Sequence, residues 1–129
     1  MSYDLMVFDP EAAPASRPAF LAWFHEQTRW GPGYDYNDPR TCTPRLRAWF
    51  DEMSQRFPPM NGPFASDDFD DLAVSDYAIG PHVIYIAFSW SEAQPAYNTM
   101  FALAQRHLVG FYDVSDPDEN RLIWTPPRA

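Results

Sequence analysis

The chain has 129 residues, of which 46% are hydrophobic and 17% aromatic, enough to build the core of one domain spanning residues 1–129. Eighteen acidic and nine basic residues give a formal net charge of -9, which repels phosphate groups, so binding to nucleic acid or to a membrane surface is not expected. Every basic residue is an arginine, and the absence of lysine excludes Schiff-base chemistry and a phosphate-loop lysine.

Two features predict a cytoplasmic protein. The single cysteine, Cys42, cannot form an internal disulfide, and the opening MSYDLMVFDP lacks the basic leader and the apolar run of a signal peptide. No apolar run comes near the roughly 20 residues that a membrane-spanning helix needs. We therefore expect a soluble protein without a membrane anchor.

A strand and a helix are predicted first. Residues 3–9 are apolar-rich and are followed by Pro10, as in a short buried strand. Ser16 can cap a helix that runs to about Arg29. The apolar stripe of this helix, at spacings of three and four, consists of Phe20, Trp23 and Phe24.

A loop rich in Gly, Pro, Asn and Asp at residues 31–42 leads to a second predicted helix. Thr43 is a capping residue, and Pro44 suits the first helical position because it has no N–H to leave unpaired. The prolines at 58 and 59 end this helix. Its stripe consists of Leu46, Trp49, Phe50, Met53 and Phe57.

A β-hairpin is predicted next, with strands at residues 75–79 and 82–90 and a turn at Gly80 and Pro81. A third helix starts between residues 91 and 95. Its stripe consists of Tyr97, Met100, Phe101, Ala104 and Leu108, and Trp23, Trp49 and Phe101 are expected to be core residues.

Gly110 is the expected stop of the third helix, since glycine readily adopts the left-handed conformation found at helix ends. Residues 111–115 and 121–125 then flank a polar turn as a second hairpin. The order β-α-α-β-β-α-β-β predicts the α+β class, as a ferredoxin-like split βαβ sandwich with an extra helix and an added edge strand. Another α+β arrangement of the same elements is the alternative.

The strand at 82–90 is apolar on both faces. Ile84, Ile86 and Phe88 alternate with Val83, Tyr85 and Ala87. One face is expected to pack on helices, and the other needs a cover. Residues 58–74 are the simplest choice, and a second copy or a different protein are the alternatives.

A cluster of aspartates precedes the first hairpin. A calcium loop starting at Asp68 would need glycine at its sixth position and glutamate at its twelfth, where this chain has Ala73 and Ile79. We therefore predict no structural metal, although weak Ca²⁺ or Mg²⁺ binding stays open. A solvated acidic loop is the simplest interpretation, and carboxylates around an aromatic residue also suit partner binding. The candidate binding residues are Asp67, Asp68, Phe69, Asp70, Asp71 and Asp76.

No catalytic residue and no cofactor is assigned. The histidines, His25, His82 and His107, are on different predicted elements and lack zinc-site spacing, and Cys42 has no nucleophile signature. A second acidic stretch consists of Asp113, Asp116, Asp118 and Glu119, and it would form an acidic face if it lay beside the first. The candidate exposed aromatic residues in loops are Trp30, Tyr34, Tyr36, Phe64 and Phe69.

Four stretches carry a resemblance: MSYDLMVFDP, FLAWFHEQTRW, LRAWFDEMSQRFPPMNGP and GFYDVS. Together they resemble a family of small acidic bacterial proteins, which is similar to the immunity proteins of polymorphic toxins. The resemblance implies that the protein neutralises a cognate toxin by occluding a basic cleft, as a monomer or a homodimer, and it supplies no catalytic residues. One alternative is a small ferredoxin-like ligand-binding domain or enzyme of the kind that forms dimers. Another is a homo-oligomeric structural domain.

Overall fold

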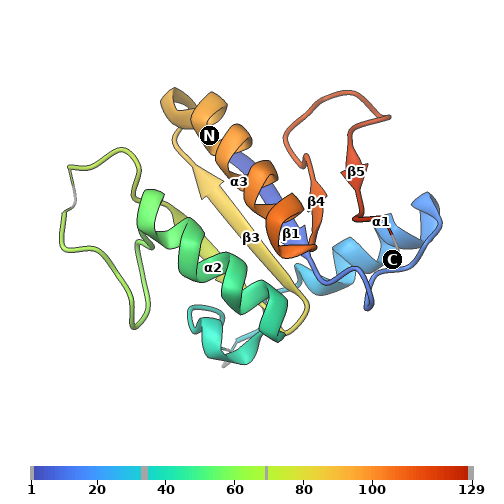
Figure 1. The fold of residues 1–129 in the computed structure, drawn as a ribbon, viewed down its shortest axis with the longest axis horizontal. Coiled ribbons are helices and arrows are strands. Elements are labelled where there is room, and N and C mark those ends of the chain that lie inside the picture. The colour runs from blue at the N-terminus through green and yellow to red at the C-terminus, as the bar shows by residue number, and fades with distance from the viewer. Residues whose placement is uncertain (1, 33–34, 69, 128–129) are drawn as a thin grey trace.

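A computed structural model describes residues 2–32, 35–68 and 70–127. Within these residues the protein has three α-helices and a five-stranded antiparallel sheet, so the predicted α+β class is confirmed (Figure 1). In chain order the elements are β1 (Tyr3–Phe8), α1 (Arg17–Gln27), η1 (Pro39–Thr41), α2 (Pro44–Arg56), β2 (Asp76–Ile79), β3 (Val83–Phe88), η2 (Trp90–Glu92), α3 (Ala93–His107), β4 (Gly110–Tyr112) and β5 (Ile123–Trp124), where η marks a 3₁₀ turn.

The strands lie in the order β2-β3-β1-β4-β5, and every neighbouring pair is antiparallel. β1 is central: Tyr3 pairs with Phe88 of β3, and Met6 pairs with Tyr112 of β4. This register puts four chain positions at one end of the sheet, namely the start of β1, the end of β3, the start of β2 and the end of β4. The loops that follow or precede these positions therefore share that end.

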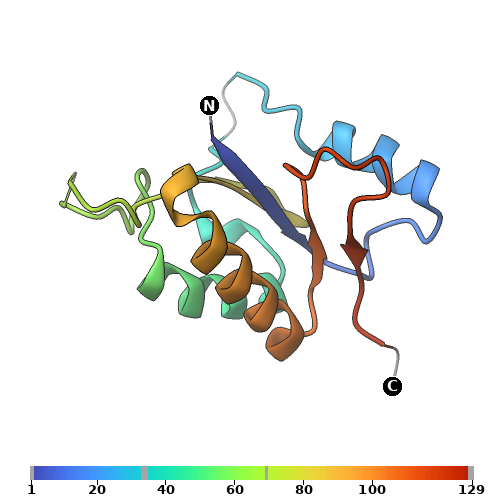
Figure 2. The same ribbon diagram turned by 90° about the horizontal axis from the view of Figure 1, so that it is seen from above.

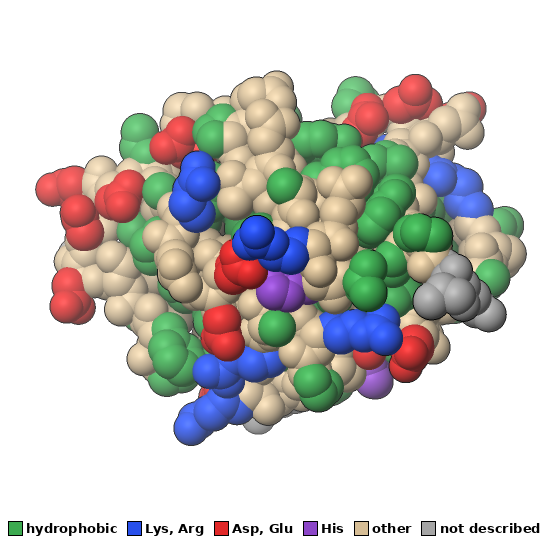
Figure 3. All heavy atoms as spheres, viewed as in Figure 1, with side chains coloured by type: hydrophobic (Ala, Val, Ile, Leu, Met, Phe, Trp, Pro, Cys, Tyr) green, Lys and Arg blue, Asp and Glu red, His purple; other side chains and the backbone are tan. Residues whose placement is uncertain are grey.

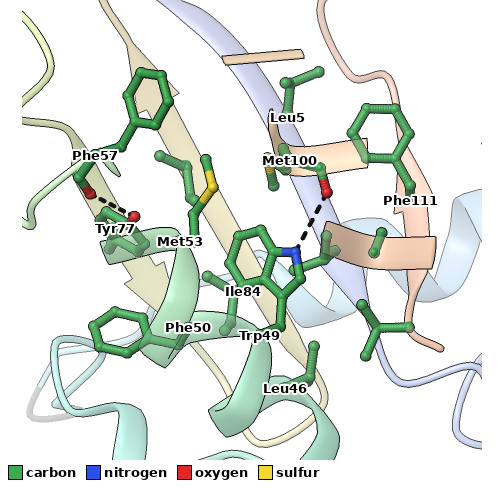
Figure 4. Close-up of a cluster of buried hydrophobic side chains, with 14 of the residues drawn as sticks. Leu5, Leu46, Trp49, Phe50, Met53, Phe57, Tyr77, Ile84, Met100 and Phe111 are labelled. Carbon is green, nitrogen blue, oxygen red and sulfur yellow. Dashed lines mark hydrogen bonds between the residues drawn. The ribbon is translucent and has the colours of Figure 1, made fainter. Parts of the chain in front are cut away.

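One face of the sheet packs on α2 and α3. Its core contains the predicted stripe of α2, and Trp49 is fully buried with its indole N–H donating to the carbonyl oxygen of Met100 at 3.4 Å (Figure 4). Because successive residues of a strand point to opposite faces, the β3 residues on this side are Ile84, Ile86 and Phe88. This part of the sequence prediction is confirmed.

The opposite face is covered by α1, which lies across the sheet from α2 and α3 (Figure 2). Phe20 and Phe24 pack on Tyr112 with ring centroids 5.3 and 5.0 Å away, and Val83 belongs to the same cluster. Trp30, just after the helix, packs against this cluster as well. The expectation that residues 58–74 cover this face is wrong.

Residues 58–74 instead lie at the edge of the sheet beside β2, where Pro59 forms a parallel bridge with Ser75. The physical reason is local: α2 ends next to the start of β2, so the connecting segment has only to turn back at that edge. It never crosses to the far face.

The end of α3 also differs from the prediction. The helix ends at His107, and Leu108, with φ of 58°, takes the left-handed cap position expected for a glycine. Leu108 is exposed and leaves the apolar stripe. Gly110 instead starts β4, where a Cβ atom would lie 2.2 Å from the ring of Phe8. Glycine is needed there for space and not for its backbone conformation.

Two residues expected in the core are only half-buried. Trp23 lies at the margin of the cluster under α1, and Phe101 lies at the margin of the cluster under α2 and α3.

Of the helices in the described part of the chain, none combines the length and the hydropathy that crossing a bilayer requires.

Candidate protein-binding surface

The acidic loop, residues 58–75, connects α2 to β2 and projects from the body of the molecule (Figure 1). Its base is closed by main-chain hydrogen bonds: Ser75 donates to the carbonyl of Pro58 at 2.9 Å, and Met60 donates to the carbonyl of Ser75 at 2.8 Å. Just outside the base, the buried hydroxyl of Tyr77 donates to the carbonyl of Phe57 at 2.7 Å. The two ends of the loop are therefore fixed to the core.

The aspartates help to shape this loop. The carboxylate of Asp68 accepts a hydrogen bond from the N–H of Asp70 at 3.1 Å, and that of Asp71 accepts one from the N–H of Ala73 at 2.9 Å. Such Asx turns replace main-chain pairing where the chain has neither helix nor strand. The sequence therefore specifies turns here as well as charge.

The near side of the loop rests on the body at two places. Gly62, with φ of 89°, lies so close to Asn37 that an added Cβ atom would be 2.5 Å from its carbonyl oxygen. The ring of Phe64 packs edge-on to Phe50 with centroids 6.0 Å apart, and the guanidinium of Arg47 lies 5.4 Å from the ring centroid. These contacts hold the loop in one orientation.

The loop also exposes apolar surface among its charges. Met60, Phe64 and Leu72 have 46%, 46% and 59% of their surface exposed. Asp67, Asp68, Asp70, Asp71 and Asp76 are all exposed, and the last is the first residue of β2. Phe69, predicted as the aromatic anchor, lies outside the described residues.

Sequence reasoning overlooked Met60 and Leu72. A usable signal existed, because each is a large apolar residue within a stretch of Pro, Gly, Asn and Asp that lacks helical or strand periodicity. Such a residue has no stripe to join and is therefore exposed unless a tertiary contact covers it. Of the other loop aromatics, Trp30 is partly buried, Tyr36 is 36% exposed, and Tyr34 lies outside the described residues.

The second acidic stretch, residues 113–119, lies in the β4–β5 connection, at the opposite edge of the sheet from the acidic loop. Both stretches nevertheless lie at the same end of the strands, since one precedes β2 and the other follows β4. Acidic side chains accordingly gather on the left and at the upper right of the molecule in Figure 3. The two stretches flank one end of the sheet and do not form a continuous face.

The opposite end of the sheet is richer in positive charge. Arg45 and Arg47 lie in the first turn of α2, and Arg106 and His107 lie in the last turn of α3. Glu52 joins the two helices there, 2.8 Å from both Arg106 and His107, and the hydrogen bond from His107 is the main cause that lowers its pKa. The arginines at this end already have carboxylate partners: Arg45 lies near Glu11, Arg47 near Asp51 and Arg106 near Glu52.

The side chains with catalytic potential are Cys42 and the three histidines. Burial raises the pKa of the Cys42 thiol to about 11, and this thiol donates to the carbonyl of Pro39 at 2.9 Å, so it is a poor nucleophile at neutral pH. The histidines lie apart, on α1, in the β2–β3 turn and at the end of α3. Among the residues that the structure describes, no group of three His, Cys, Asp or Glu side chains could hold a metal ion.

A groove of about 1050 Å³ runs between the β1–α1 connection, the start of α1 and the C-terminal segment. Phe20, Leu108 and Ile123 contribute apolar walls, and Arg17 and Arg45 contribute positive charge. Both arginines already have partners: Arg45 lies 3.6 Å from Glu11, and Arg17 donates to the carbonyl of Glu119 at 2.8 Å. The described lining contains neither histidine nor cysteine.

Comparisons with known proteins add no further constraint: no family model, no curated protein and no solved structure matches the chain.

Proposed function

We propose that this chain is a small binding protein that blocks a basic surface of a protein partner with its acidic loop. One observation carries the proposal: a loop fixed at its base, and shaped by its own aspartates, presents Met60, Phe64 and Leu72 among exposed carboxylates. A partner that covers these apolar groups removes them from water, which favours binding, and the carboxylates around them attract a basic partner. No catalytic role is included.

The partner class follows from the resemblance to immunity proteins. A toxin that acts on nucleic acid or nucleotides needs a basic cleft, and a projecting acidic loop has the charge to enter one. The proposal includes the cytoplasmic location predicted from the sequence and leaves the protein a monomer or a homodimer. Phe69 remains a predicted contact residue.

We also infer that the fold is the ferredoxin-like sandwich predicted from the sequence. Its support is the order β2-β3-β1-β4, with β1 and β3 in the centre and α2 and α3 on one face. In this interpretation α1 is the extra helix and β5 the added edge strand. A small-molecule-binding function is the alternative, and the groove beside Arg17 and Arg45 is its support.

The test uses the protein encoded by the neighbouring gene and measures its association and dissociation rates at two salt concentrations. Asp67→Asn with Asp70→Asn removes two loop charges and keeps Asp68 and Asp71, whose carboxylates accept the turn hydrogen bonds. We expect slower association and a weaker salt dependence, because exposed charges mainly steer encounter. Met60→Ser with Leu72→Ser should mainly speed dissociation.

The matched control is Glu11→Gln with Glu26→Gln, which changes the net charge equally at exposed positions away from the loop. Equal slowing by the control and by the loop variant would mean that net charge alone matters. Unchanged rates in both loop variants would remove the acidic loop from the interface.

A further inference from the structure

A small cavity lies at the acidic end of the sheet, between the two acidic stretches. We call it the tyrosine pocket. It has a volume of about 340 Å³ and is lined by Tyr3, Ala93, Gln94 and Tyr97. Tyr3 is the first residue of β1, and the other three belong to the first turns of α3. The sheet register brings these segments together, since Tyr3 pairs with Phe88 just before η2.

The pocket is aromatic and partly open. The ring of Trp90, half of whose surface is exposed, lies 5.0 Å from the ring of Tyr3. Tyr97 is held from behind by edge-on contacts with Phe101 at 6.0 Å and with Phe111 at 5.3 Å. Tyr3 and Tyr97 are therefore fixed by packing, and their remaining surface contributes to the cavity.

The electrostatic environment of the pocket favours a cation. The main chain brings the second acidic stretch to the pocket: the N–H of Asp4, the residue after Tyr3, donates to the hydroxyl of Ser115 at 2.7 Å, and the N–H of Ser115 donates to the carbonyl of Asp4 at 3.1 Å. Asp116 follows directly, and after burial the negative charges of Asp113 and Asp116 contribute to raising the pKa of both Tyr3 and Tyr97. The nearby guanidinium of Arg121 donates to the hydroxyl of Tyr112 and to the main-chain oxygen of Asp116. Its positive charge also lowers the pKa of Asp113, so it offsets part of the negative charge of Asp113 and Asp116. Within the described residues, one carboxylate oxygen of Asp113 is buried without a hydrogen-bond partner.

The start of α3 does not reverse this preference. A helix N-terminus favours anions, but η2 precedes α3 directly and Glu92, a carboxylate, occupies the junction. An anion at the pocket would also meet Asp113 and Asp116.

We infer that the tyrosine pocket receives an arginine side chain of the basic protein partner, held by the faces of Tyr3 and Tyr97 and by the carboxylate of Asp116. A guanidinium stacks well on aromatic rings and interacts with them within about 6 Å of the ring centroid. The inference rests on the proposed function, because it specifies where that partner places a cation. It adds a second contact, at the centre of the acidic end, to the contact made by the acidic loop.

The test titrates the full chain with N-acetylarginine amide and follows the ring signals of Tyr3 and Tyr97 and the indole N–H of Trp90 by NMR. N-acetylcitrulline amide, which has the same shape without the charge, is the comparison probe. We expect saturable shifts in the millimolar range for the arginine probe, and binding at least fivefold weaker for the citrulline probe. Equal shifts with both probes, or no shift with either, would overturn the inference.

Two variants locate the site. Tyr97→Leu keeps apolar bulk but removes a ring face, and Asp116→Asn removes one charge while its side-chain oxygen can still accept the turn hydrogen bond from Asp118. Each should weaken arginine binding several-fold. Asp118→Asn is the matched control, because it removes an equal charge from an exposed position in the same connection, and it should change little. Equal weakening by Asp116→Asn and Asp118→Asn would reduce the effect to general charge and reject the pocket.

The outcomes separate this inference from the proposed function. If the acidic-loop variants leave partner binding unchanged while the arginine titration is saturable, the proposed function fails and the pocket stands as a cation site. If the loop variants weaken partner binding and the arginine probe causes no shift, only the pocket is rejected.

Discussion

The two faces of the sheet are covered in different ways. On one face α2 and α3 contact each other and bury a continuous cluster that runs from Leu5 of β1 to Phe111 of β4. On the other face α1, an 11-residue helix with Phe20 and Phe24 buried, covers Phe8 and Tyr112, with Trp30 and Ile123 from flanking segments packed beside it. One short helix with a few flanking side chains suffices because aromatic side chains bury about 150 to 250 Å² each. The first face therefore depends on many aliphatic and aromatic contacts, and the second depends on a few rings.

The largest expected effect compares one tryptophan from each face. Trp49→Ala should lower the free energy of unfolding by about 3 to 5 kcal/mol, because the indole is fully buried and its space cannot close. Trp23→Ala should cost about 1 to 2 kcal/mol, because this side chain is only half-buried beside Phe8 and Phe20. Chemical denaturation measures both losses. Equal losses would contradict the difference between the faces.

A second prediction tests the ring packing of the face under α1. Gly110→Ala should cost about 1 to 3 kcal/mol, since the new methyl group would lie 2.2 Å from the ring of Phe8, itself held 4.9 Å from Phe20. Combining it with Phe8→Leu should cost less than the sum of the single changes. Gly31→Ala is the control, because an added Cβ atom there meets nothing within 4 Å.

A smaller effect, of opposite sign, is expected at the end of α3. Leu108→Gly should raise the stability by about 1 kcal/mol, because a left-handed backbone is strained for leucine and not for glycine. Ala102→Gly, at an exposed position inside the same helix, should lower the stability by about 1 kcal/mol. A loss of stability in Leu108→Gly would mean that the exposed leucine makes contacts worth more than the strain.

The smallest effect concerns Asp113, the half-buried residue that follows β4. Burial, and then the charge of Asp116, raises the pKa of this carboxyl above its ordinary value of 3.8. The folded state then binds more protons than the unfolded state, so the contribution of Asp113 to stability falls as the pH rises above about 4. Asp113→Asn should match the wild-type melting temperature near pH 3 and exceed it slightly at pH 7. A constant difference across this range would contradict the raised pKa.

The comparison also shows what the sequence can predict. The stripe Leu46, Trp49, Phe50 and Met53 is the buried side of α2, and the alternation in β3 separates its two faces correctly. Local spacing suffices for these features. Local spacing does not show on which face of the sheet a helix packs after a short connection, because either face is within reach. The sequence therefore did not predict that α1 covers the face opposite α2 and α3.

The candidate site has the same limit. The sequence locates both acidic stretches and the loop aromatics, since charge and loop composition are local properties. That the stretches share one end of the sheet depends on the register of β1 with β3 and β4, which involves residues about 80 and 100 positions apart. The tyrosine pocket, which joins Tyr3 to Tyr97, depends on the same register.

The hydrogen bonds at the base of the acidic loop have a consequence for the protein's behaviour in concentrated solution. An exposed sheet edge is a template for strand addition from a second chain, and this leads to aggregation. Along β2 that template is interrupted at both ends: Ser75 pairs with Pro58 and Met60, and the N–H of Ile79 donates to Tyr36 at 2.7 Å. At the other edge β5 has two residues. Deleting Pro58 to Met60 would therefore open this end of the edge to strand addition by a second chain, beyond any loss of partner binding.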